Sequence, residues 1–258
     1  MGTLFKGNEM LSEALDFSVS ARGKAATNSI AAFLEIFFED IPVKSVFAFR
    51  EYTPLYGGRI YHGPELSDTD IHWMYDHGIG YRIPLQNIVT SREEYLSSKP
   101  FLEKYHRKGN SVITARGELA KWIREDFPLF ELEASVINQV RTLEKLSSFL
   151  ETYDVVVLHP IMNDDLEALA TITDKARVRL FVNAGCMYQC PTMECYGSIS
   201  RMNKLVPNTE FKCAQDHVPD YAEARLTAEG MTEFDTNTLV NFGFTRFKRM
   251  RNKSNTAY

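Results

Sequence analysis

The four cysteines of this chain are the residues whose type and spacing point most directly to chemistry. The chain has 258 residues, and its four cysteines follow the pattern C-x3-C-x4-C-x17-C at Cys186, Cys190, Cys195 and Cys213. Random scatter would rarely gather every cysteine of a chain into so short a segment. Four thiolates can hold either a tetrahedral zinc ion or an iron–sulfur cluster, so the pattern predicts one metal centre bound by all four.

The spacing favours a [4Fe–4S] cluster over zinc. Structural zinc sites favour C-x2-C pairs, which this chain lacks, whereas cluster ligands tolerate irregular gaps. Cys190 is followed by Pro191, a pairing that recurs in ferredoxin-type motifs. Zinc and a set of buried thiols without metal stay open as alternatives. A radical enzyme that uses S-adenosylmethionine is disfavoured, because its C-x3-C-x2-C motif needs a cysteine where Met193 stands.

Eight short runs rich in β-branched and aromatic residues alternate with stretches of helical periodicity. We expect strands at 15–21, 43–49, 80–86, 110–115, 130–136, 154–160, 178–184 and 244–250. We expect helices between them at 28–40, 91–106, 117–126, 139–153 and 164–172. Asn28 is a candidate cap for the first of these helices, and Ser91 with Glu94 has capping-box spacing at the second.

This alternation predicts an α/β fold, a (β/α)8 TIM-type barrel, with an open doubly wound sheet as the alternative. No GxGxxG motif follows the first strand, which disfavours the dinucleotide-binding form of the open sheet. We expect a single barrel domain over residues 1–258, with an expanded metal-binding loop at 185–243 between the seventh and eighth strands. Loops of that length usually carry function, and all four cysteines lie in it.

Composition excludes several classes of protein. The chain is 44% hydrophobic and 24% charged, as globular proteins are, and its net charge of −5 gives no general field for nucleic acid. No apolar run is long enough to span a bilayer, and the amino terminus carries acids where a secretory signal would be apolar. We therefore expect a cytoplasmic protein with no membrane partner, whose thiols stay reduced and available to a metal.

Polar residues stand where the expected strands end, and in a TIM barrel the carboxyl ends of the strands surround the active site. Asn87, His159 and Asn183 end the third, sixth and seventh strands, and we expect them to be catalytic, with His159 as a general base or substrate donor. The expected substrate-binding residues are Arg59, Arg82, Asn163 and Lys248. The glycines at 57 and 58 predict a flexible loop that presents Arg59. Two arginines at one rim favour an anionic substrate, because arginine binds carboxylate and phosphate through two nitrogens.

The cysteine segment resembles the collagenase-like peptidase superfamily, which includes proteins of oxygen-independent ubiquinone hydroxylation and of tRNA and rRNA hydroxylation. The resemblance rests on VRLFVNAGCMYQCP (178–191), YDVVVLHPIMNDDLEAL before it and GFTRFKRMR near the chain end. The matching positions are Asn183, Gly185, Cys186, Cys190, Pro191, Gly243, Phe247, Lys248 and Arg251. Upstream, YGGR, YRIPLQN and NSVITARGELAKWI resemble more closely an uncharacterised bacterial and phage branch.

The resemblance covers roughly residues 15–251. It implies a TIM-type barrel with a [4Fe–4S] cluster at its carboxyl-terminal mouth. It also implies oxygen-independent hydroxylation, or modification of RNA or of a small molecule, with a partner subunit as a further possibility. The alternative function is a non-catalytic barrel, stapled by its metal, that acts as a binding or partner subunit. Peptidase activity is not expected, because no Ser-His-Asp set, HExxH motif or Cys-His pair stands out.

Overall fold

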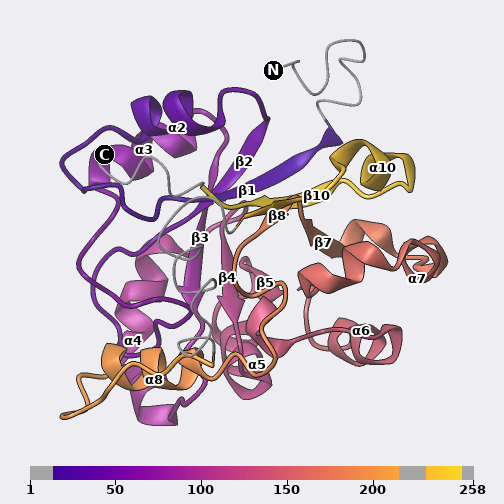
Figure 1. Ribbon diagram of the computed structural model, residues 1–258. Helices are drawn as coiled ribbons and strands as arrows, with labels where there is room; N and C mark the ends of the chain where they lie inside the picture. The colour runs from indigo at the N-terminus through magenta and orange to yellow at the C-terminus, as the bar shows by residue number, and fades with distance from the viewer. Residues whose placement is uncertain (1–13, 215–230, 252–258) are drawn as a thin grey trace.

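The computed structural model describes residues 14–214 and 231–251, which form a closed barrel of eight parallel strands (Figure 1). The order around the barrel is β1-β10-β7-β6-β5-β4-β3-β2, and β2 pairs with β1 to close it. The strands are β1 (Asp16–Ser20), β2 (Val43–Phe47), β3 (Gly80–Leu85), β4 (Ser111–Thr114), β5 (Glu131–Ala134), β6 (Val155–Val157), β7 (Val178–Phe181) and β10 (Arg246–Arg249). The expected (β/α)8 barrel is therefore confirmed, and each of the eight expected strand runs contains one barrel strand.

Helices connect the strands and surround the barrel (Figure 1). They are α2 (Ile30–Phe38), α3 (Asp68–Asp76), α4 (Arg92–Tyr105), α5 (Gly117–Asp126), α6 (Leu143–Leu150), α7 (Leu166–Thr171), α8 (Cys195–Asn203) and α10 (Thr236–Asn241). No helix in the described ranges combines the length and the apolar character that a membrane crossing requires.

Side-chain caps decide where two of the expected helices begin. Ser29, rather than Asn28, caps α2, and its hydroxyl oxygen accepts a hydrogen bond of 3.1 Å from the amide of Ala31. The capping box at α4 is confirmed: the Glu94 amide donates to the Ser91 hydroxyl at 3.2 Å, and the Ser91 amide donates to the Glu94 carboxylate at 2.8 Å. Each cap satisfies amide groups that have no partner within the first helical turn.

The strand faces that point outward build the main hydrophobic core against the helices. The rings of Phe17 on β1 and Phe247 on β10 lie 5.3 Å apart there, and both side chains are fully buried. A smaller cluster inside the barrel joins Val157 and Phe181, at the carboxyl ends of β6 and β7, to Val136. The barrel interior is thus apolar near the carboxyl ends of these strands.

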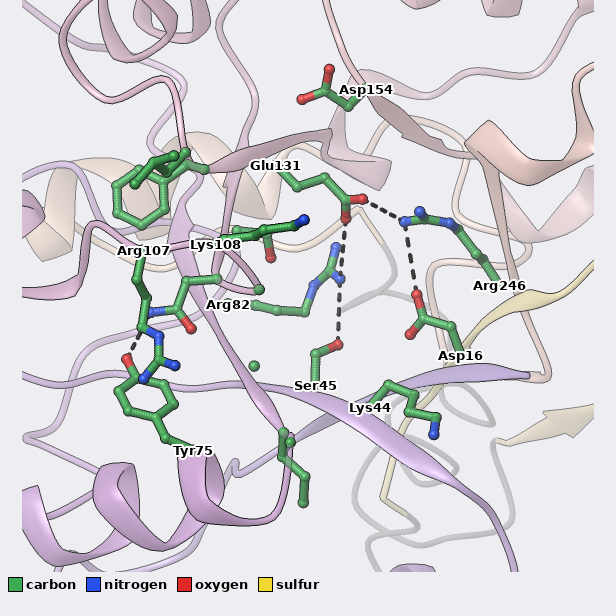
Figure 2. Close-up of a pocket in the computed structure, with 18 of the residues that line it drawn as sticks. Asp16, Lys44, Ser45, Tyr75, Arg82, Arg107, Lys108, Glu131, Asp154 and Arg246 are labelled. Atoms are coloured by element: carbon green, nitrogen blue, oxygen red, sulfur yellow. Dashed lines mark hydrogen bonds and ion pairs between the residues drawn. The ribbon is translucent and has the colours of Figure 1, made fainter. Parts of the chain in front are cut away.

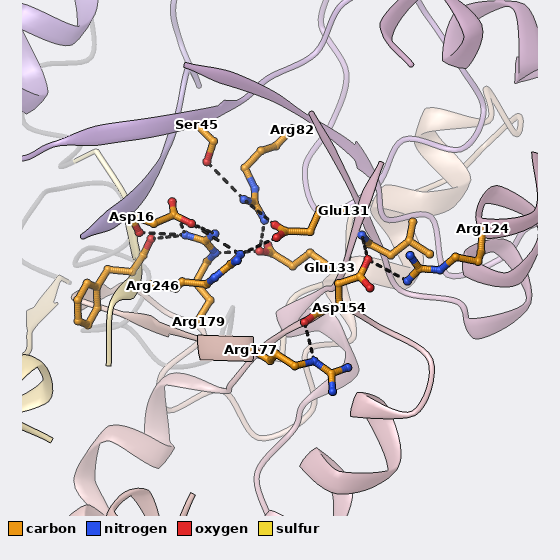
Figure 3. Close-up of polar contacts among 12 residues, drawn as sticks. Asp16, Ser45, Arg82, Arg124, Glu131, Glu133, Asp154, Arg177, Arg179 and Arg246 are labelled. Carbon is orange, nitrogen blue, oxygen red and sulfur yellow. Dashed lines mark hydrogen bonds and ion pairs between the residues drawn. The ribbon is translucent and has the colours of Figure 1, made fainter. Parts of the chain in front are cut away.

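The other half of the barrel interior holds a closed ring of alternating charges, which we call the charged ring (Figure 3). Its members in order are Arg82, Glu133, Arg179, Asp16, Arg246 and Glu131. Arg179 lies 2.8 Å from both Glu133 and Asp16, and Arg82 contacts Glu133 as well. Apart from Asp16–Arg246, which joins the neighbouring strands β1 and β10, these pairs link strands that are not neighbours in the sheet, so the side chains cross the interior.

The connection between β7 and β10 carries structure of its own. It contains β8 (Asn183–Ala184), which pairs antiparallel with β9 (Thr232–Glu233), and also α8 and α10. Residues 215–230 of the expected 185–243 loop lie outside the described ranges. All four cysteines lie in the described part, between β8 and residue 214.

Candidate functional site

The cysteine segment crosses the carboxyl-terminal mouth of the barrel. It leaves β7 through β8 and reaches α8, which lies beside the carboxyl end of β3. There the Asn87 side-chain amide donates to the Ser200 carbonyl at 3.0 Å, and the Ile88 amide donates to the Ser200 hydroxyl at 3.1 Å. Two distant points of the barrel rim therefore hold the two ends of the segment.

The four thiols gather within electrostatic range of one another. Cys190 is buried, Cys195 and Cys213 are half-buried, and Cys186 is exposed. Burial first, and then the neighbouring thiols, raise the pKa of Cys195 to about 12. Among the described residues, no three histidine, cysteine, aspartate or glutamate side chains are arranged to hold one metal ion. The arrangement is a loose gathering of four sulfurs rather than a tight cage.

Two arginines that the sequence analysis did not select lie beside this gathering. Arg141 donates to the Cys190 carbonyl at 3.2 Å and lies 3.1 Å from Nε2 of His159. Arg22 lies two residues beyond the end of β1, and burial together with Arg59 lowers its pKa, while Glu65 and Cys186 act in the opposite direction. No described carboxylate lies within ion-pair distance of Arg22 or Arg141, so the mouth has two cations available to an anion.

His159 lies beside the cysteine segment, as expected of a residue at the mouth. It is fully buried, and its Nδ1 accepts a 3.2 Å hydrogen bond from the amide of Ile161. Burial and the adjacent Arg141 lower its pKa to about 4, although a hydrogen bond with the Met187 backbone acts in the opposite direction. The imidazole is therefore neutral at neutral pH and a weaker base than an ordinary histidine.

Asn183 and Asn87 use their side chains to hold the backbone. Asn183 donates to the Met250 carbonyl at 2.9 Å and accepts from the Met250 amide at 2.8 Å, which ties the ends of β7 and β10 together. Asn87 donates to the carbonyls of Pro54 and Ser200, and its oxygen accepts from the amide of Val89 at 3.0 Å. Both residues lie at the mouth as expected, but their hydrogen-bonding capacity serves the fold.

Asn163 and Lys248 lie deeper, next to Phe181. Asn163 donates to the Phe181 carbonyl at 2.6 Å, while its own oxygen is buried and has no hydrogen-bond partner among the described residues. The Lys248 ammonium lies 4.2 Å from the ring centre of Phe47 and 5.6 Å from that of Phe181. Burial, with Arg82, Arg179 and Arg59 contributing, lowers the pKa of Lys248 to about 7.

Arg59 and Arg82 are placed differently from the expectation that both line one rim. Arg59 forms a two-pronged ion pair with Glu65 and stacks 4.0 Å from the ring centre of Phe49. Arg82 belongs to the charged ring, because it stands near the start of β3 rather than its end. Neither guanidinium is open to a substrate at the mouth.

The loop that carries Arg59 is close-packed rather than flexible. A side chain at Gly57 would place its Cβ 2.3 Å from the Gln86 carbonyl, and Gly58 has a φ of +78°. The two glycines therefore let the loop approach the end of β3 and turn there.

The sequence held a signal for one of the two arginines at the mouth. A search for polar residues just after each expected strand could have found Arg22. Arg141, in contrast, stands seven residues beyond the end of β5 and gave no such signal.

Comparison with known proteins supports the fold alone. No protein-family model matches the chain, and no curated protein matches its sequence. Among solved structures, the chain is similar to the U32 peptidase Mk0906, with a TM-score of 0.59 over 92% of each chain. The two sequences are 14% identical over that alignment, which is a likeness of architecture and carries no activity with it.

Proposed function

We propose that Cys186, Cys190, Cys195 and Cys213 bind a [4Fe–4S] cluster at the carboxyl-terminal mouth. We further propose that the protein is an enzyme of oxygen-independent hydroxylation or a related redox modification. The observation that carries the proposal is the gathering of four thiols at the barrel end where substrates of this fold bind. Thiolates are the ligands of iron–sulfur clusters, and a bound cluster would supply electron transfer there. Because the four sulfurs do not form a tight cage, the segment that carries them would have to close around a bound cluster.

The substrate we propose is an anionic small molecule or an RNA. Arg22 and Arg141, which no described carboxylate pairs, are the groups that would bind its negative charge. They replace Arg59 and Arg82 in that role, since those two guanidinium groups are held by carboxylates. His159 is neutral because of its low pKa and is fully buried, so it would position Arg141 rather than contact the substrate.

A non-catalytic barrel is the second candidate, and the anchoring of α8 favours it. Asn203 at the end of α8 donates to the carbonyls of Tyr56 and Arg59 and accepts from the amide of Tyr61. A zinc ion bound by the same cysteines would then serve as a staple for a binding surface or a partner subunit.

The test is anaerobic purification followed by metal and sulfide analysis. We expect a brown protein with about four iron atoms and about four acid-labile sulfides per chain, and with reversible bleaching on reduction. Stoichiometric zinc without sulfide would rule out the cluster. A cluster that cannot be reduced would favour the non-catalytic candidate.

Replacing Cys190 with serine tests whether the metal organises the segment. In the metal-loaded protein we expect residues 185–214 to resist proteolysis, and in Cys190→Ser we expect cleavage to concentrate there while the barrel stays intact. Circular dichroism of both proteins controls for loss of the barrel. Equal protection of the segment in the two proteins would contradict this role.

A further inference from the structure

A pocket opens at the amino-terminal end of the barrel, opposite the cysteines (Figure 2). Its volume is about 620 Å3, and its walls come from the first residues of β1 to β5 and β10 and from the turns before β3, β4 and β5. The strands are parallel, so this end and the cysteine mouth lie on opposite faces. The pocket is large enough for a small organic ligand.

The lining of this pocket is cationic, although the whole chain is acidic. Six cations and three carboxylates line it, an excess of three positive charges, whereas the chain has a net charge of −5. The cations are Lys44, Arg82, Arg107, Lys108, Arg124 and Arg246, and the carboxylates are Asp16, Glu131 and Asp154. This excess of positive charge, in a chain that is acidic as a whole, favours the binding of an anionic ligand in the pocket.

The charged ring and one surface pair account for all three carboxylates. Asp16 and Glu131 contact arginines of the charged ring, and Asp154 lies 2.8 Å from Arg124. No described carboxylate lies within ion-pair distance of Lys44, Arg107 or Lys108. In Figure 2, Lys44 and Lys108 lie on either side of Arg82. Three cations around one cavity are therefore available to a ligand.

The floor of the pocket offers hydrogen-bond donors and little bulk. A side chain at Gly80 would place its Cβ 2.1 Å from the Gly109 carbonyl oxygen, so β3 and the turn before β4 touch through bare backbone. Arg82 lines the pocket and is nine-tenths buried or more, and its Nε has no hydrogen-bond partner among the described residues. An unpaired buried donor is unfavourable, and a ligand oxygen or its bound water would satisfy it.

We propose that this pocket binds a small organic molecule that carries a diphosphate group. Lys44, Arg107 and Lys108 match the three or so negative charges of a diphosphate, and lysine and arginine both bind phosphate oxygens. Beside them, the exposed side chain of Leu129 provides apolar surface for the rest of the molecule, and the Tyr75 ring stacks with Arg107 at 3.9 Å. A pocket of this size suits a small molecule better than an RNA strand, which needs an extended basic surface.

The test is calorimetric titration with pyrophosphate at low ionic strength. The wild-type protein should bind one pyrophosphate per chain in a saturable manner, and Lys44→Gln/Lys108→Gln should weaken binding about tenfold or more. The matched control is Lys121→Gln/Lys145→Gln, which removes the same charge from α5 and α6, outside the pocket. We expect the control to bind within about twofold of wild type.

Hydrogen exchange and the cysteine variant separate this site from the mouth. Pyrophosphate should slow amide exchange in residues 107–111 and 128–131, which border the pocket, and Cys190→Ser should bind it as wild type does. Absence of saturable binding, or equal weakening in both double variants, would overturn the proposal. So would binding of an RNA oligonucleotide at Lys44 and Lys108 without binding of pyrophosphate.

Discussion

Lys248 shows how burial outweighs local attraction at the scale of one side chain. Its ammonium faces the rings of Phe47 and Phe181, which favour the charged form by about 1–2 kcal/mol. No described carboxylate lies within ion-pair distance, and Arg82 and Arg179 of the charged ring repel it. Desolvation therefore dominates and lowers the pKa of Lys248 to about 7.

This low pKa predicts how stability depends on pH. The unfolded chain binds the Lys248 proton more tightly than the folded chain, so the free energy of unfolding should rise as pH increases from about 7 to 10.5. Lys248→Met should stabilise the protein by about 2–4 kcal/mol at pH 7 and remove most of that rise. Urea unfolding at both pH values checks this, with Lys121→Met on exposed α5 as control. A variant less stable than wild type at pH 7 would contradict it.

At the scale of elements, α8 is held in place from outside the cysteine segment. Its Ser200 contacts Asn87 and Ile88 at the end of β3, and Lys204 just beyond it pairs with Glu94 of α4 at 2.6 Å. The helix that begins with Cys195 therefore depends on two other elements for its position. Long-range side-chain contacts, rather than helix propensity, determine where this cysteine lies.

Removing the Asn87 side chain should loosen this attachment. Asn87→Ala takes hydrogen-bond donors from the buried carbonyls of Pro54 and Ser200, so we expect a loss of about 2–4 kcal/mol in the free energy of unfolding. Amide exchange should accelerate in α8 more than in α5. The exposed substitution Ser97→Ala serves as control. Unchanged exchange in α8 would show that Asn87 does not hold it.

At the scale of the whole molecule, the barrel interior is divided into two layers of different chemistry. The charged ring fills the amino-terminal half with three arginines and three carboxylates, and it is electrically neutral as a unit. Apolar side chains such as Val157 and Phe181 fill the carboxyl-terminal part. Desolvation of the three buried members, Arg82, Glu133 and Arg179, is costly, and the opposite charges beside each of them offset that cost.

Removing one charge from the charged ring should lower the free energy of unfolding. One carboxylate oxygen of Glu133 contacts both Arg82 and Arg179, so Glu133→Gln leaves two buried guanidinium groups without their shared charge. We expect a loss of about 3–5 kcal/mol in the free energy of unfolding by urea. Glu118→Gln, at an exposed pair with Arg116, should change it by less than about 1 kcal/mol. Similar small losses in both variants would mean that the ring contributes little.

The sequence alone determined the eight barrel strands in chain order and the position of the cysteines between β7 and β10, and it favoured the barrel over an open sheet. These features follow from local periodicity, which each segment carries independently of the others. Local signals were weaker at element ends. The helix expected at 139–153 begins at Leu143, because Gln139 has a φ of 49° and Thr142 caps the helix.

Only the tertiary structure decided which polar residues are available for function. Period-two alternation indicates that Arg82 can face the interior, but its pairing with Glu133 depends on how the closed barrel brings β3 and β5 together. Arg59 is likewise neutralised by Glu65, while Arg22 and Arg141, more than 110 residues apart in sequence, both come to lie beside the thiols. Charge pairing and desolvation are set by neighbours in space, and a single sequence does not display those neighbours.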